Sequence, residues 1–187
     1  MKSYSLIFLL AILLNGCGEP PAVKFVSEKT EFLRENRFEI QYPADWEVSG
    51  TEDDISSDKK STYFFVHPQN KKCRIIIDRF LIPANDDGSL VSFTKMAAEK
   101  IREFKDQFSK TGYKDFSFSK TESAWIGRGA TKLVIKGTRG DVTRELTTYL
   151  IARDNYFYAV SYDWFSNWNS QARSRVIQAV NSFAFIH

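Results

Sequence analysis

Short stretches of this chain alternate apolar and polar residues, a pattern that predicts β-strands with one buried face. Residues 38–42 alternate strictly, and a proline then predicts a turn into a second strand that begins at Trp46. Residues 53–61 are polar and predict a loop. Two apolar segments follow, 61–67 and 72–82, and the Pro-Gln-Asn-Lys sequence between them predicts a β-hairpin.

The segment 72–82 carries apolar residues on both of its faces. One face holds Cys73, Ile75, Ile77 and Leu81, and the other holds Ile76, Phe80 and Ile82. A strand in a half-solvated sheet would need only one apolar face. We therefore expect helices to cover both faces of the sheet that contains this strand.

Two segments have the three-and-four spacing of amphipathic helices. In the first, apolar residues recur from Leu90 to Phe108, and Asp87 or Ser89 can cap its start. The second runs from about 169 to 182. Four strand candidates punctuated by short turns lie between the helices, at residues 116–126, 130–137, 141–153 and 156–164.

The order of these elements is strands, a long helix, a four-strand meander and a closing helix. An antiparallel β-sheet flanked by helices is an α+β fold, here an α/β/α sandwich. The chain has 187 residues, of which 43% are hydrophobic, enough for one packed domain. We expect a signal peptide over residues 1–16, a lipidated tether over 17–36 with a helical turn near Phe32, and a single domain over 37–187.

The start of the chain resembles a bacterial lipoprotein leader. A lysine at position 2 precedes an apolar run, residues 6–14, that is too short to span a bilayer and predicts a signal peptide. The sequence Leu14-Asn15-Gly16-Cys17 then resembles the lipobox. In such leaders the chain is cut before the cysteine, which is acylated, so the resemblance implies that Cys17 is the lipid attachment site and the membrane anchor. An ordinary secreted protein and an uncleaved anchor are the alternatives.

The leader implies a place in the bacterial cell envelope. In a Gram-negative cell we expect the outer membrane, facing the periplasm, because Gly18 is not the aspartate that resembles an inner-membrane retention signal. In other cells we expect the outer face of the plasma membrane. Once Cys17 is lipidated, Cys73 is the remaining thiol, which excludes an internal disulfide. Its alternation with Ile75 predicts burial, and a reactive or intermolecular thiol is the alternative.

The domain resembles the Mog1/PsbP-like family, which includes the bacterial DUF1795 and DcrB-type lipoproteins. The matching features are Phe38, Ile40, Tyr42, Pro43 and Trp46, the mid-chain helix, the hairpin from Tyr149 to Tyr162, and the closing helix before Phe185. The resemblance covers about residues 37–186 and implies the same fold. The family includes a Ran-binding nuclear factor, photosystem II extrinsic subunits and envelope proteins of unclear role. Because the shared motifs are packing motifs, they transfer no functional residue.

Few side chains of the sequence suit catalysis or metal binding. The two histidines are His67, at the end of an apolar strand, and His187, and the sequence has no common serine-hydrolase, zinc or redox motif. Residues 85–88 lack the ligand spacing of a calcium loop, and residues 127–132 do not match a phosphate-binding loop. We therefore expect no catalytic site, no metal and no cofactor, and a structural role for His67.

The aromatic cluster of Trp164, Phe165 and Trp168 is the candidate contact patch, with packing at the end of the sandwich as the alternative. A formal charge of +3 does not predict a nucleic-acid partner. We therefore expect a lipid-anchored, non-catalytic envelope protein that binds a protein partner or assists assembly. The alternatives are a periplasmic hydrolase with carboxylates from distant segments, and a small-molecule binding or sensing domain with a closed apolar pocket.

Overall fold

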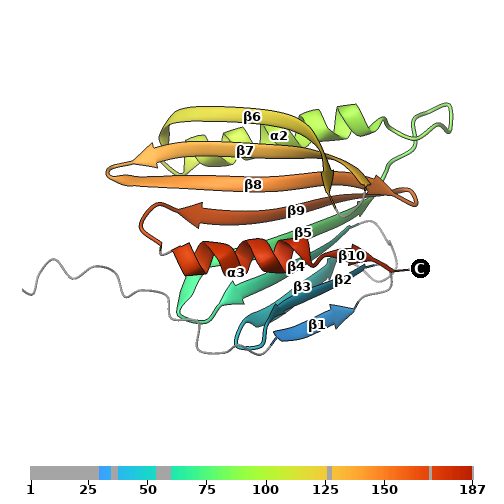
Figure 1. The fold of residues 1–187 in the computed structure, drawn as a ribbon. Helices are drawn as coiled ribbons and strands as arrows, with labels where there is room; N and C mark the ends of the chain where they lie inside the picture. Colours follow the sequence, from blue (N-terminus) through green and yellow to red (C-terminus); the bar gives the residue numbers. More distant parts are fainter. Residues whose placement is uncertain (1–29, 35–37, 54–59, 126–127, 169, 187) are drawn as a thin grey trace, which may run out of the picture.

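The computed structural model describes residues 30–34, 38–53, 60–125, 128–168 and 170–186. The leader and Cys17 lie outside these residues. The described strands form two antiparallel sheets, and two helices accompany them (Figure 1). The first elements are β1 (Thr30–Arg34), β2 (Phe38–Pro43), β3 (Glu47–Asp53), β4 (Lys60–His67), β5 (Asn70–Leu81) and α2 (Phe93–Lys110). The remaining elements are β6 (Lys114–Trp125), β7 (Arg128–Arg139), β8 (Val142–Arg153), β9 (Tyr156–Phe165), α3 (Ser170–Asn181) and β10 (Ala184–Phe185).

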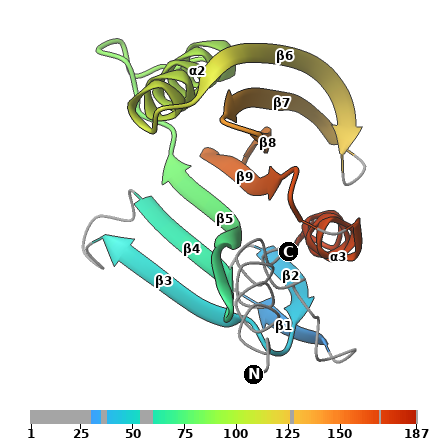
Figure 2. The ribbon, with the colours of Figure 1, turned by 90° about the vertical axis from the view of Figure 1, so that its left-hand side faces the viewer.

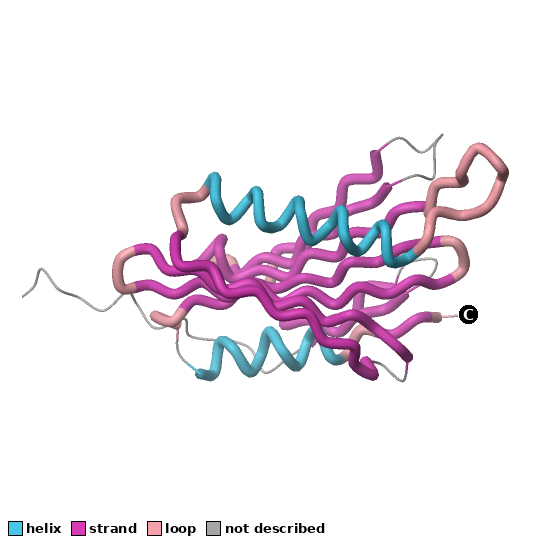
Figure 3. The backbone as a smooth tube through the Cα atoms, turned by 90° about the horizontal axis from the view of Figure 1, so that it is seen from above, coloured by secondary structure: helices cyan, strands magenta, loops and turns pink. Residues whose placement is uncertain are grey.

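The large sheet has seven strands in the order β3-β4-β5-β9-β8-β7-β6, and the small sheet has the order β1-β2-β10. Helix α2 lies on one side of the large sheet, and α3 lies on the other side together with the small sheet (Figures 2 and 3). The predicted meander is confirmed as β6 to β9, with antiparallel pairing throughout. The α+β sandwich predicted from the sequence is therefore confirmed.

Alternation along β5 explains how the large sheet packs on both sides. Cys73, Ile75 and Ile77 are fully buried against the small sheet and α3, as the sequence predicts. On the opposite face, Ile76 and Phe80 are only partly buried. The expected covering of both faces is thus complete on one side, whereas α2 leaves part of the other side open.

The small sheet corrects the predicted boundary of the domain. Residues 30–34, which the sequence pattern assigns to the tether, form β1 and pair with β2 from Thr30↔Pro43 to Arg34↔Glu39. The helical turn expected near Phe32 is therefore wrong, because this segment gains backbone hydrogen bonds from a strand next to it in the fold. Pairing begins before residue 37, the expected start of the domain.

Helix α2 begins later than its apolar spacing predicts. Ser92 caps it by accepting a hydrogen bond from the Lys95 backbone N–H at 3.3 Å. Ser89 instead donates its backbone N–H and its hydroxyl to the Asp87 carboxylate, which closes a turn of the preceding loop. Both expected caps are therefore wrong, because their side chains hydrogen-bond to each other. Among the described residues, no helix is long and apolar enough to cross a membrane.

Candidate functional site

A groove of about 220 Å³ opens between α2 and the part of the large sheet that α2 leaves uncovered. We call it the α2 groove. Its lining comes from β4, β5, β8, β9 and α2, and it includes Phe64 and Ile76, two partly exposed apolar side chains from neighbouring strands. A second hollow, of about 460 Å³, follows the flank of α2 and shares Lys100 and Glu103 with the groove.

The position of α2 explains why the groove is open. The apolar face of the helix packs against β7, β8 and β9 through Leu133, Ile135, Leu146, Leu150 and Phe157. The helix therefore lies to one side of β4 and β5, whose side chains on this face keep partial access to solvent. On this face, the large sheet is therefore buried at β7 to β9 and partly accessible at β4 and β5.

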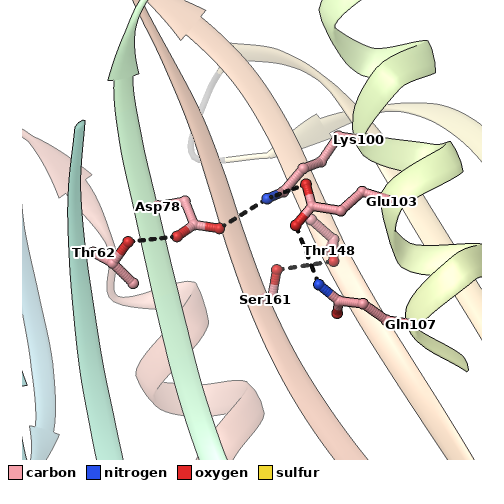
Figure 4. Close-up of polar contacts among 7 residues, drawn as sticks. All are labelled: Thr62, Asp78, Lys100, Glu103, Gln107, Thr148 and Ser161. Carbon is pink, nitrogen blue, oxygen red and sulfur yellow. Dashed lines mark hydrogen bonds and ion pairs between the residues drawn. The ribbon is translucent and has the colours of Figure 1, made fainter. Parts of the chain in front are cut away.

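One wall of the groove is a cluster of ion pairs around Lys100 (Figure 4). The Lys100 Nζ lies 3.1 Å from Asp78 Oδ2 and 3.0 Å from Glu103 Oε2, and the Lys100 side chain is only 9% exposed. The Thr62 hydroxyl donates to Asp78 Oδ1 at 2.8 Å, and the Gln107 amide donates to Glu103 Oε1 at 3.1 Å. This cluster connects β4 and β5 to α2 across the groove.

A second cluster surrounds Asp163 of β9, whose side chain is 4% exposed. The Arg144 Nε donates to Asp163 Oδ1 at 2.7 Å, and the Arg74 Nε lies 3.6 Å from Asp163 Oδ2. Between the two clusters, the buried hydroxyls of Thr148 and Ser161 form a hydrogen bond of 2.9 Å (Figure 4). Polar groups that face the groove are thus held in fixed positions by neighbours.

The groove lining balances three cations against three carboxylates: Arg74, Lys100 and Arg144 against Asp78, Glu103 and Asp163. Each of these carboxylates has a cation within 4 Å. Among the described residues, no group of three or more His, Cys, Asp or Glu side chains could hold a metal ion. The arrangement is suited to binding a neutral, amphipathic ligand by hydrogen bonds and apolar contact.

His67 ends β4 and is buried, 1% exposed. Its Nδ1 accepts a hydrogen bond of 3.1 Å from the Gln69 backbone N–H, which closes the turn into β5. Burial lowers the pKa of His67, and the charge of Asp45 opposes this shift. A neutral imidazole that accepts from the backbone fits the structural role predicted for His67.

The Cys73 side chain is fully buried, as its alternation with Ile75 predicts. Burial raises the pKa of Cys73 to about 12, and the charge of Asp163 adds to the shift. The thiolate is the reactive form of cysteine, so Cys73 behaves as a small core residue.

The predicted contact patch is divided between the two sides of the sheet. Trp164 is partly buried on the α3 side, where the Arg173 guanidinium lies 4.6 Å from its ring. Phe165, the next residue of β9, points to the α2 side, is buried, and lies 4.9 Å from the Trp168 ring. The three side chains therefore do not form one surface, because successive residues of a strand face opposite ways.

The α2 groove is absent from the sequence-based predictions, although one signal for it exists. Lys100 falls among the apolar positions of α2, three residues after Ala97 and four before Phe104, where a charged side chain is buried. Buried charges are normally paired, so this lysine could have predicted an acidic partner. Its partner, Asp78, lies on a strand that the sequence does not connect to the helix.

Comparison with known proteins supports the fold. No family model matches the chain, and no curated protein matches its sequence. Among solved structures, the cyanobacterial PsbP protein CyanoP of Synechocystis sp. PCC 6803 matches with a TM-score of 0.57 and 12% identity, over 86% of this chain and 94% of that one. The domain has a PsbP-like fold. At this identity the likeness concerns the fold alone.

Two further structures match the chain more loosely. LpqN of Mycobacterium tuberculosis, described as involved in cell envelope biogenesis, has a TM-score of 0.45 and 11% identity over 85% of this chain and 91% of that one. A Pseudomonas aeruginosa protein of unknown function, described as a putative regulator, has a TM-score of 0.40 and 12% identity over 82% and 94%. Superpositions this loose add nothing to the argument about this chain.

Proposed function

We propose that this protein is a lipid-anchored, non-catalytic protein of the bacterial cell envelope, and that its α2 groove binds an extended segment of a partner protein. The leader supports the anchor, with Cys17 as the acylated residue. The expected location is the outer membrane facing the periplasm in a Gram-negative cell, or the outer face of the plasma membrane otherwise.

The composition of the α2 groove carries the proposal of a polypeptide ligand. Phe64 and Ile76 offer an apolar strip for side chains, and the flanking Asp78–Lys100 and Asp163–Arg144 pairs offer acceptors and donors of both charges. The groove has no net charge to attract a strongly charged ligand, because the three positive and three negative side chains of its lining cancel. A polypeptide segment supplies apolar side chains together with backbone donors and acceptors, which complement such a surface.

The two alternatives receive less support from the geometry. A hydrolase would need an acid or base that is free to contact the substrate, whereas each groove carboxylate lies within 4 Å of a cation of the protein itself. A sensing domain would need an enclosed cavity, and the space between β2 and α3 that Tyr42 and Ala179 line measures only about 10 Å³.

Site-specific photocrosslinking in the native host tests this function. Benzoylphenylalanine replaces Phe64 in the groove, and in a matched control it replaces Phe118, an exposed phenylalanine on β6. We expect a discrete crosslinked partner from position 64 and none from position 118. The partner is then identified by mass spectrometry, and the crosslink should map to one continuous segment of it.

A second pair of variants separates the groove from the anchor. Phe64→Lys should abolish the crosslink obtained with a photoreactive group at Gln107, while Val48→Lys, at an exposed apolar position on the opposite face of β3, should leave it intact. Intact mass of the native protein should show acylation that Cys17→Ala removes. Equal crosslinking from positions 64 and 118 would refute the groove, and an unmodified Cys17 would refute the anchor.

A further inference from the structure

The turn from β7 into β8 and the passage from β9 into α3 lie at the same end of the large sheet, at the left of Figure 1. A third hollow, of about 380 Å³, opens at this end. We call it the end pocket. The residues that determine its chemistry are Asn70, Lys72, Tyr113, Arg139, Phe165 and Trp168. They come from the start of β5, the ends of β7 and β9, and the segments after α2 and β9, so only the folded sheet brings them together.

The end pocket contains two cations without a carboxylate partner. Neither Lys72 nor Arg139 forms an ion pair with a described residue, whereas Lys100, Arg74 and Arg144 of the neighbouring α2 groove are all paired. No Asp or Glu belongs to the pocket lining. The pocket therefore has a positive field that the fold does not neutralise.

The neutral polar groups of the end pocket also favour an anion. The Asn70 Oδ1 accepts a hydrogen bond of 3.1 Å from the Lys72 backbone N–H, so the free end of this amide is its NH₂ donor. The Asn167 amide and the Tyr113 hydroxyl add further donors. Charged and neutral donors that converge on one space are the usual means of holding an oxyanion.

Aromatic rings form the apolar part of the end pocket. The rings of Phe165 and Trp168 lie 4.9 Å apart, and the Lys72 Nζ lies 5.8 Å from the Phe165 ring centre. Both tryptophan and phenylalanine offer a flat surface on which an apolar or planar group can pack. The pocket thus combines a place for a negative charge with a place for an apolar body.

We propose that the end pocket binds a phosphate group carried on an apolar or aromatic body, with Lys72 and Arg139 holding the phosphate and Phe165 and Trp168 packing against the body. Two unpaired cations match the charge of a phosphate monoester, roughly −1.5 to −2 at neutral pH. Phosphatidic acid, whose headgroup is a phosphate monoester, and a soluble phosphate monoester both present this chemistry.

The register of the strands bears on whether a lipid phosphate can reach the pocket. Thr30 pairs with Pro43, and the turn after Pro43 leads to the end of β3 opposite Val66, so Thr30 lies at the same end of the molecule as the pocket. The chain from Cys17 to Thr30 spans at most roughly 45 Å when fully extended. If Cys17 is acylated, as the proposed function holds, lipid phosphates lie within reach of this end. The binding of a soluble ester does not depend on the anchor.

Calorimetric titration of the full chain with Cys17→Ala tests the pocket itself. We expect phenyl phosphate to bind, inorganic phosphate to bind about tenfold more weakly because it lacks the body, and benzyl alcohol not to bind. Arg139→Gln and Lys72→Gln should each weaken phenyl phosphate binding about tenfold. Lys95→Gln, which removes an exposed lysine at the start of α2, should leave it unchanged.

Flotation with phosphatidylcholine vesicles, with and without phosphatidic acid, distinguishes the two sources. Arg139-dependent flotation with the anionic vesicles assigns the ligand to the lipid, and binding of phenyl phosphate without flotation assigns it to a soluble ester. Failure of phenyl phosphate to bind at millimolar concentration, or equal weakening by Lys95→Gln, overturns the proposal. Because Arg139→Gln leaves the α2 groove untouched, the crosslink from position 64 reports separately on the proposed function.

Discussion

Replacing Lys100 with methionine should destabilise the folded domain strongly. Methionine keeps most of the apolar stem but removes the ammonium group that lies 3.1 Å from Asp78 and 3.0 Å from Glu103. Glu103 is half exposed and regains water, whereas the Asp78 side chain is only 13% exposed and keeps the Thr62 hydroxyl as its hydrogen-bond donor. The loss of stability therefore comes mainly from the Asp78 carboxylate, which stays buried but loses its counter-ion.

Breaking a buried ion pair from one side costs about 3–5 kcal/mol. Because water has some access to Asp78 through the open groove, we expect the lower end, about 3 kcal/mol. For a domain of this size, such a loss lowers the Tm by roughly 6–12 °C. Lys95→Met, the same substitution at an exposed position of the same helix, should change the free energy of unfolding by less than about 0.5 kcal/mol.

A double-mutant cycle measured by urea unfolding tests this reasoning. Asp78→Asn keeps an oxygen that accepts from Thr62, so the double variant Asp78→Asn/Lys100→Met has no unpaired charge at this position. We expect it to be more stable than Lys100→Met alone, with a coupling energy of at least about 1.5 kcal/mol. Two results would refute the interpretation of the Lys100–Asp78 contact as a buried ion pair. One is a fall in the free energy of unfolding of less than about 1 kcal/mol for Lys100→Met, and the other is that the effects of the two single substitutions add to within about 0.5 kcal/mol.

Four further predictions concern the single positions Cys73, Gly140 and Trp125. In the Cys17→Ala protein, Cys73 should react with a thiol-specific disulfide reagent at pH 8 on the order of a thousandfold more slowly than after unfolding, and fast labelling would contradict its burial. The pKa of Cys73 is 9.0 when the thiol is exposed and about 12 in the folded protein, so the unfolded chain loses its thiol proton first as the pH rises above 9. The free energy of unfolding should therefore fall by about 1.4 kcal/mol between neutral pH and pH 10. Urea titrations at these two pH values should show no such contribution in Cys73→Ala. Gly140→Ala should lower the free energy of unfolding by about 1 kcal/mol, because Gly140 has a φ of +58°. Gly129→Ala, at an ordinary φ with open space around the added carbon, should be neutral or stabilising. Equal shifts of Tm in the two variants would contradict this. Trp125→Ala should cost about 3–5 kcal/mol, since the ring is buried between two aromatic rings at 4.5 and 5.4 Å, and a change below 1 kcal/mol in urea unfolding would show that this stack is not part of the core.

Local pattern was enough to predict most of the elements of this fold. Strict alternation identified residues 38–42 as a strand and placed Cys73 in the core, because a strand repeats every two residues regardless of its neighbours. The turn at Asp154-Asn155 was equally readable, since both residues tolerate the positive φ of 50° and 63° that the two-residue hairpin requires. The resemblance at the domain start, carried by packing residues, led to the correct fold.

The elements that the sequence missed depend on partners distant in the chain. Nothing local in residues 30–34 marks a strand, because their pairing partner is β2 and they are not part of the large sheet. The division into two sheets likewise follows from packing, with Phe38 and Phe183 stacked at 5.2 Å between the small sheet and α3. Such contacts join segments that no spacing rule relates.

The sequence by itself determined the fold class, the burial of the apolar strands and the leader-like start of the chain, because periodicity and short motifs are properties of neighbouring residues. Only the tertiary structure decided where the polar side chains meet. The position of α2 over β7 to β9 opens the α2 groove and brings Lys100 to Asp78, and the shared end of the strands places Lys72 and Arg139 in the lining of one pocket. These sites exist because sheet register and helix placement set distances that the order of residues leaves open.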